Sequence, residues 1–125
     1  MIKDDISMKR NMDLIRKILL ATEADEHGFA PKIVIEGYTE EEINYHAFLL
    51  GEAGLANVSV ITTFGAQSPR GKIVRLTWQG HEFLDASRDN QIWNQTKDKI
   101  NQIGGATIQI WIVILTEFIK KKLGL

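Results

Sequence analysis

The segment from Ala106 to Leu123 constrains the fold most, because it carries more apolar residues than one helical face can bury. One set recurs at the i, i+3, i+4, i+7 spacing of an amphipathic helix: Ile108, Trp111, Ile112, Leu115, Phe118 and Ile119. Ile110, Val113 and Ile114 cover a second face of the same helix. A helix that packs on its own core needs only the first set, and a second apolar face left in water marks an interface.

We therefore predict a homodimer, most simply a twofold one, in which this helix packs on its mate. The predicted contact residues are Ile110, Val113, Ile114 and Phe118. The alternative is that a small domain encloses the helix on both sides. The longest apolar-rich run, from Ala106 to Leu115, contains Thr107 and Gln109 and is far shorter than the roughly 18–20 apolar residues that cross a bilayer, so we predict no contact with a membrane.

The composition is that of one globular domain. The chain has 125 residues, too few for two ordinary domains, and 44% of them are hydrophobic. The 15 lysines and arginines balance 16 acidic residues, which excludes a generically basic nucleic-acid coat. The absence of cysteine excludes disulfides, thiolate metal sites and a cysteine nucleophile. The first ten residues lack the apolar stretch of a signal peptide, so we expect a cytoplasmic protein.

The charge is distributed unevenly along the chain. Residues 29–69 carry Lys32 alone against five glutamates, whereas residues 70–89 and 90–125 each carry more basic than acidic residues. Phosphate groups are attracted by clustered cations and repelled by carboxylates. The middle of the chain should therefore repel nucleic acid, and the part after Pro69 could attract it.

Helical spacing and capping residues predict two helices in the first half of the chain. The first is expected over Asn11–Ala24, with Asn11 as its N-cap. Pro31 and the β-favouring run Lys32–Ile35 predict a brief strand after it. Thr39–Glu42 then forms a capping box that opens a helix running to about Ala53.

Two β-favouring runs follow, Val58–Thr63 and Lys72–Leu76. The turn-rich link between them predicts a β-hairpin with a long tip. Thr77 is expected to cap a helix that ends near Asp89 or Asn90, and a further helix should stop at Gly104. The last helix is expected from about Ala106 to Leu123.

The order helix, short strand, helix, hairpin, helix is that of a winged helix-turn-helix with a reduced second helix. We therefore predict an α+β, mainly helical fold, with a β-hairpin wing and two extra C-terminal helices. Residues 1–7 would form a loosely docked arm, residues 8–89 the winged-helix domain, and residues 90–125 a helical extension packed on the same domain.

Several segments carry a family resemblance. Ile43–Leu55 looks like the third helix of winged-helix regulators, and Arg75–Asp85 looks like the strand-to-helix corner after the wing, where Leu-Thr-x-x-Gly is common. With Met8–Leu20, Trp93–Ile100 and Lys120–Leu125, the chain resembles an uncharacterised domain family common in bacterial phages and prophages. The resemblance covers Met8 to Leu125 and implies a winged-helix fold and a mobile-element context. It supplies no catalytic residues.

In a DNA-binding winged helix, the exposed face of the third helix enters the major groove. The candidate DNA contacts are Asn44 and Tyr45 on that helix and Arg70, Lys72 and Arg75 on or beside the wing. The glutamates at positions 40–42 oppose groove entry, because they would approach phosphates without a nearby cation. The alternative is that these glutamates are simply favourable first-turn residues and that another element covers Tyr45 and Phe48.

No catalytic or metal-binding pattern is present. The three histidines lack metal-ligand spacing, and we expect His46 and His81 to be partly buried side chains. Phosphate-cradling and nucleophile-elbow motifs are absent. We therefore expect no enzymatic activity, no cofactor and no metal. The leading hypothesis is a DNA-associated, homodimeric regulator of phage type, and the alternative is a protein-interaction module whose acidic helix binds a host or phage protein.

Overall fold

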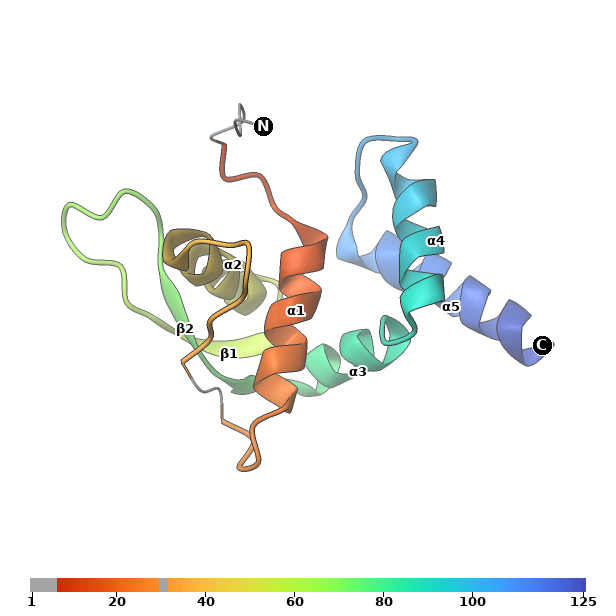
Figure 1. Ribbon diagram of the computed structural model, residues 1–125, viewed down its shortest axis with the longest axis horizontal. Coiled ribbons are helices and arrows are strands. Elements are labelled where there is room, and N and C mark those ends of the chain that lie inside the picture. Colours follow the sequence, from red (N-terminus) through yellow and green to blue (C-terminus); the bar gives the residue numbers. More distant parts are fainter. Residues whose placement is uncertain (1–6, 30–31) are drawn as a thin grey trace. The chain divides into compact units, whose positions relative to one another are not determined.

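The computed structural model describes residues 7–29 and 32–125, which contain five helices and one two-stranded antiparallel sheet (Figure 1). In chain order they are α1 (Met12–Glu23), α2 (Glu40–Glu52), β1 (Ala56–Val60), β2 (Gly71–Leu76), α3 (Trp78–Ala86), α4 (Asn90–Asn101) and α5 (Ile108–Leu123). These elements confirm the predicted α+β, mainly helical fold class. Apart from Ser7, the predicted N-terminal arm lies outside the described residues.

The chain divides into two compact units, Met1–Gly80 and His81–Leu125. The division falls inside α3, whereas the sequence analysis placed a boundary between residues 89 and 90. The first unit contains α1, α2 and the hairpin, and the second contains α4, α5 and most of α3. The assignment of residues 8–89 to a winged-helix domain stays a prediction.

Local capping interactions begin α1 and α2 where the sequence predicts. Asn11 Oδ1 accepts a hydrogen bond from the Leu14 backbone N–H (3.1 Å). At α2, Thr39 Oγ1 accepts from Glu42 N–H (3.1 Å) and Glu42 Oε1 accepts from Thr39 N–H (2.9 Å), which completes the capping box. Both helices therefore have their first free N–H groups satisfied by side chains close in sequence.

The predicted strand at Lys32–Ile35 is wrong. These residues have no regular secondary structure, and the sheet pairs only β1 with β2. Val34 is exposed, and Ile35 ends the run by accepting a hydrogen bond from Tyr38 N–H in a turn. A β-favouring composition does not make a strand without a neighbouring edge to pair with, because strand stability comes from cross-strand contacts.

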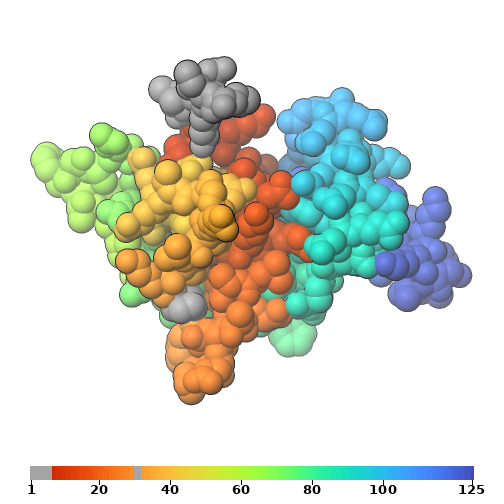
Figure 2. Space-filling view, in the orientation of Figure 1, coloured from red at the N-terminus to blue at the C-terminus, as the bar shows by residue number. Residues whose placement is uncertain are grey.

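β1 and β2 form the predicted hairpin with an irregular register. Ala56 pairs with Leu76 and Val60 with Gly71, and a shift between Asn57 and Val58 leaves Val74 as an extra residue in β2. Beyond the strands, Ile61 N–H donates to Arg70 O (2.9 Å). The segment 61–70, which we call the hairpin loop, projects from the body of the first unit (Figures 1 and 2).

The Leu-Thr-x-x-Gly segment makes a corner where β2 meets α3. Thr77 Oγ1 donates to Gly54 O (2.6 Å) and accepts from Gly80 N–H (3.1 Å), while Thr77 N–H donates to Leu55 O (3.2 Å). A Cβ on Gly80 would lie 1.9 Å from Leu55 O, so only glycine permits this approach. The corner therefore attaches the start of α3 to the end of α2.

Three aromatic side chains pack together in the second unit. Trp93 on α4 stacks on Trp111 of α5, with ring centroids 4.9 Å apart, and meets Phe83 edge-to-face at 6.3 Å. Asp89 caps α4 and Thr107 caps α5. No helix within the described ranges is both long and apolar enough to cross a membrane.

His46 links α1 to α2 and is sensitive to protonation. Its Nδ1–H donates to Glu42 O (2.8 Å), and its Nε2 accepts from Asn11 N–H (2.9 Å). One nitrogen donates and the other accepts, so the two hydrogen bonds require the neutral imidazole. Burial lowers the pKa of His46 below its ordinary value of 6.5, although the Glu42 carbonyl and charge act in the opposite direction.

We predict that the free energy of unfolding falls as the pH drops below 6.5, because the unfolded chain then binds a proton that the folded His46 resists. The loss should level off once the pH passes the lowered pKa of the folded state. Urea unfolding between about pH 5 and 7.5 measures it. A His46→Gln variant should lack this part of the slope; an unchanged slope would show that His46 is not its source.

We also predict that Gly80→Ala destabilises the first unit by about 3 kcal/mol, because the new methyl meets the rigid backbone oxygen of Leu55. Gln79→Ala, at the exposed neighbouring position of α3, is the control, because it adds no atom next to the backbone. Thermal or urea unfolding should rank Gly80→Ala as clearly the more damaging change; equal losses would contradict the proposed role of the corner.

Candidate nucleic-acid interface

A groove between α2 and the hairpin brings together residues that are far apart in sequence. It has a volume of about 230 Å³, and its polar and charged lining residues are Lys32, Glu40, Asn44, Arg70 and Lys72. Three of the five predicted DNA contacts therefore share one surface, which we call the α2–hairpin groove. Tyr45 and Arg75 are not among its lining residues.

Two glycines allow the hairpin to lie this close to α2. A Cβ on Gly71 would lie 2.8 Å from the Phe48 backbone nitrogen, and one on Gly51 would lie 2.9 Å from the Val58 Cβ. Arg70 and Lys72 flank Gly71, so the close approach of β2 carries both cations to α2. The backbone contact at Gly71 thus sets the position of the groove's positive charge.

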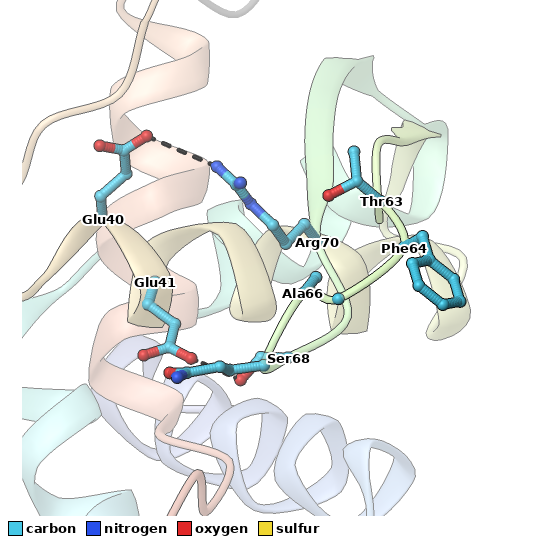
Figure 3. Close-up of a pocket in the computed structure, with 9 residues that line it drawn as sticks. Glu40, Glu41, Thr63, Phe64, Ala66, Ser68 and Arg70 are labelled. Carbon is cyan, nitrogen blue, oxygen red and sulfur yellow. Dashed lines mark hydrogen bonds and ion pairs between the residues drawn. The ribbon is translucent and has the colours of Figure 1, made fainter.

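The first turn of α2 holds the hairpin loop through two glutamates. Arg70 Nη2 lies 3.6 Å from Glu40 Oε1, and Ser68 Oγ donates a hydrogen bond to Glu41 Oε2 (2.7 Å), as Figure 3 shows. These contacts border a second hollow of about 460 Å³ beneath the loop, in which Arg70 extends toward Glu40. Phe64 lies at the loop's outer edge and is fully exposed.

The guanidinium of Arg70 is only loosely satisfied. Its ion pair with Glu40 is longer than a hydrogen bond, and its buried Nε has no hydrogen-bond partner among the described residues. The backbone of Arg70 is held more firmly, since its N–H donates to Thr62 Oγ1 (2.8 Å). The backbone of Arg70 is therefore fixed, while N–H groups of its guanidinium remain available to bind an anion.

The family of the chain is shown by comparison with known sequences. Residues 9–107 match the family described as "Hypothetical protein (DUF2513)". The chain belongs to the DUF2513 family. An uncharacterized protein of Haemophilus influenzae is 38% identical over 95 residues, which cover 74% of this chain and 79% of that relative. No solved structure matches the chain.

The range matched by the DUF2513 family contains the whole α2–hairpin groove, from Lys32 to Ile73. It also contains the corner at Thr77 and Gly80. It ends at the N-cap of α5, so the helix that carries the predicted dimer contacts begins directly after it. The phage context implied by the resemblance stays a prediction.

Tyr45 and Arg75 lie away from the groove in the DUF2513 structure. Tyr45 is half-buried and lies about 100° further around α2 than Asn44, with its ring against His46 (5.7 Å between centroids). Arg75 lies opposite Asn57 on the hairpin, and its Nη1 donates to Leu76 O (3.4 Å). The sequence analysis predicts that Asn44 and Tyr45 both contact DNA from the same helix, but consecutive residues of a helix point in different directions.

Sequence reasoning did not include Lys32 and Glu40 in the interface. Lys32 was the single cation of an acidic segment, and 38 positions separate it from Arg70. The positive charge of Lys32 is the one signal that could have suggested it. No local sequence pattern, however, shows that the segment before α2 lies beside β2 in the folded chain. The sequence indicates Glu40 only as a favourable first-turn residue, and the structure adds its ion pair with Arg70.

The predicted dimer contacts all lie on α5 in the second unit. Ile110 and Val113 are exposed, with relative accessibilities of 43% and 55%, while Ile114 and Phe118 are half-buried. The apolar set that was expected to pack on the core, from Ile108 to Ile119, is only partly buried. Ile112 is exposed, and only Trp111 and Leu115 are buried on this helix. No cluster of three potential metal ligands occurs in the described part of the chain.

Proposed function

We propose that this DUF2513 chain is a non-enzymatic winged-helix protein that binds duplex DNA with α2 and the hairpin and acts as a homodimeric regulator. In this proposal the hairpin loop is the wing and α2 is the helix nearest the DNA. The observation that carries it is the α2–hairpin groove, whose lining includes Lys32, Arg70 and Lys72 together with Asn44. Cations in such a position hold phosphates, and an asparagine beside them can pair with adenine.

The charges of the groove support an anionic ligand. Its lining includes three cations and one carboxylate, that of Glu40. The acidic first turn of α2 opposes DNA less than its sequence implies, because each glutamate has an intramolecular role: Glu42 in the capping box, Glu40 beside Arg70 and Glu41 on Ser68. The same contacts weaken the alternative in which this acidic turn binds another protein.

The homodimer is supported by the exposed apolar side chains of α5. Ile110, Ile112 and Val113 are exposed within two turns of one helix. Burying a fully exposed side chain of this size gains roughly 1.5–3 kcal/mol, and these side chains still have about half of their surface in water. A twofold contact would bury two copies of each residue.

We predict that the full chain binds a mixed-sequence duplex of about 20 base pairs near 50 mM salt, where phosphate contacts are strongest. The double variant Arg70→Ala and Lys72→Ala should weaken binding. It should also reduce the slope of the logarithm of the binding constant against the logarithm of the salt concentration by about 2, since each phosphate contact contributes about 0.9 to that slope. Fluorescence anisotropy over a salt series measures both effects.

The matched control is Lys120→Ala with Lys121→Ala, which removes the same charge from the exposed end of α5. This variant should keep the salt dependence of the unmodified chain. Equal weakening by both pairs would point to nonspecific charge attraction. If the unmodified chain does not bind DNA near 50 mM salt, the protein-interaction alternative replaces this proposal.

We predict that Glu40→Gln strengthens DNA binding by about fivefold, because it removes a carboxylate from the groove and frees Arg70 from its ion pair. Glu52→Gln removes the same charge from an exposed position at the other end of α2 and should change affinity much less. The same anisotropy assay compares the two variants. Weaker binding by Glu40→Gln would mean that Glu40 positions Arg70 for its ligand.

We predict that the purified chain is a dimer and that Ile110→Lys with Val113→Lys makes it a monomer, because two cations cannot be buried in an apolar contact. Light scattering after size exclusion measures the mass of each species. Asn94→Lys with Asn101→Lys, at exposed positions of α4, is the control and should remain dimeric. A monomeric unmodified chain would contradict the dimer.

A further inference from the structure

A second groove lies in the second unit, between the end of α4 and the C-terminal half of α5. We call it the α4–α5 groove; its volume is about 670 Å³. Its apolar lining residues are Ile100, Ile103, Ile114, Phe118 and Leu125. Ile103 and Leu125 have relative accessibilities of 73% and 85%, so the apolar surface is open to solvent. It shares no lining residue with the α2–hairpin groove, and two of its lining residues, Ile114 and Phe118, are also predicted dimer contacts.

The local structure explains how these side chains reach the groove. The N–H of Gly124 donates to Lys121 O (3.2 Å) and that of Leu125 to Lys120 O (2.8 Å), with Gly124 in the left-handed region at φ +76°. This is the Schellman arrangement, which turns the next residue back along the helix. On the other side, Ile103 follows the end of α4, where its N–H donates to Ile100 O (3.0 Å).

The rim of the groove is basic. Lys99, Lys120 and Lys121 are exposed lining residues, and the single acidic lining residue is Glu117. Lys99 Nζ lies 5.6 Å from the centre of the Phe118 ring, so one cation sits directly beside the apolar floor. A ligand must therefore offer apolar groups to the floor and negative charge to the rim.

The openness of the groove favours a polypeptide segment over a small molecule. Small-molecule sites enclose about 70–90% of their ligand, whereas Ile103 and Leu125 here face solvent. An amphipathic helix needs only one face covered. The stretch from Ile114 to Leu125 is about 16 Å long at 1.5 Å per residue, the length of three helical turns.

We propose that the α4–α5 groove binds an acidic amphipathic helix of a partner protein. Its apolar residues, spaced i, i+3, i+4 and i+7, pack on Ile103, Ile114 and Phe118, and its carboxylates pair with the rim lysines. A second copy of this chain fits the groove less well. The apolar half of its α5, from Ile108 to Thr116, carries no carboxylate to pair with those lysines.

The test selects binders from a displayed library of helical peptides about 16 residues long, since shorter helices are marginal in water. Each peptide carries leucine at i, i+3, i+4 and i+7, and the other positions contain glutamate, lysine, glutamine or serine in equal amounts. The bait is the full chain. We expect the selected peptides to be enriched in glutamate over lysine several-fold, and their affinity to fall as salt is added.

The best peptide is then measured by fluorescence anisotropy against two variants of similarly exposed side chains. Ile103→Asp should weaken binding at least about tenfold, and Val34→Asp, in the first unit and outside the groove, should change it less than about twofold. Circular dichroism confirms that both variants fold. No enrichment, lysine enrichment, or equal effects of the two variants would overturn the proposal. A dimer that Ile103→Asp dissociates and Val34→Asp preserves would place a second copy in the groove and would overturn it as well.

Discussion

The close approach of the hairpin to α2 is the contact on which the first unit depends. It is possible because Gly71 lacks a side chain where the backbone of β2 meets Phe48 N, and Gly80 likewise lets the start of α3 lie against Leu55 O. The corner at Thr77 adds hydrogen bonds to Gly54 and Leu55 at the end of α2. Two of the three cations of the proposed DNA interface owe their position to this contact, because Arg70 and Lys72 reach α2 only through β2.

The acidic first turn of α2 shows how one short segment serves several purposes. Glu42 completes the capping box, Glu40 lies beside Arg70, and Glu41 accepts a hydrogen bond from Ser68. In isolation, three consecutive glutamates look like a surface that rejects phosphate. In the folded unit two of them hold the hairpin loop, so the net charge of the groove is set by Lys32, Arg70 and Lys72 against Glu40 alone.

The predictions that succeeded rest on interactions between residues close in sequence. Asn11, Thr39 and Thr77 each cap a helix with their own side chain, and a capping residue can be recognised from its neighbours. The strand predicted at Lys32–Ile35 failed because a strand needs a partner that local composition does not reveal. Lys32 was missed as a groove residue for the same reason, since its neighbours in space lie far along the chain.

The sequence by itself determined the helices, their caps, the hairpin and the apolar surplus of the last helix, because these follow from periodicity and from contacts within a few residues. Only the tertiary structure decided that Asn44 faces the hairpin while Tyr45 does not, and that Arg70 lies beside Glu40. It also showed the groove between α4 and α5. Such surfaces form between elements separated in sequence, and their geometry depends on how closely two backbones can approach.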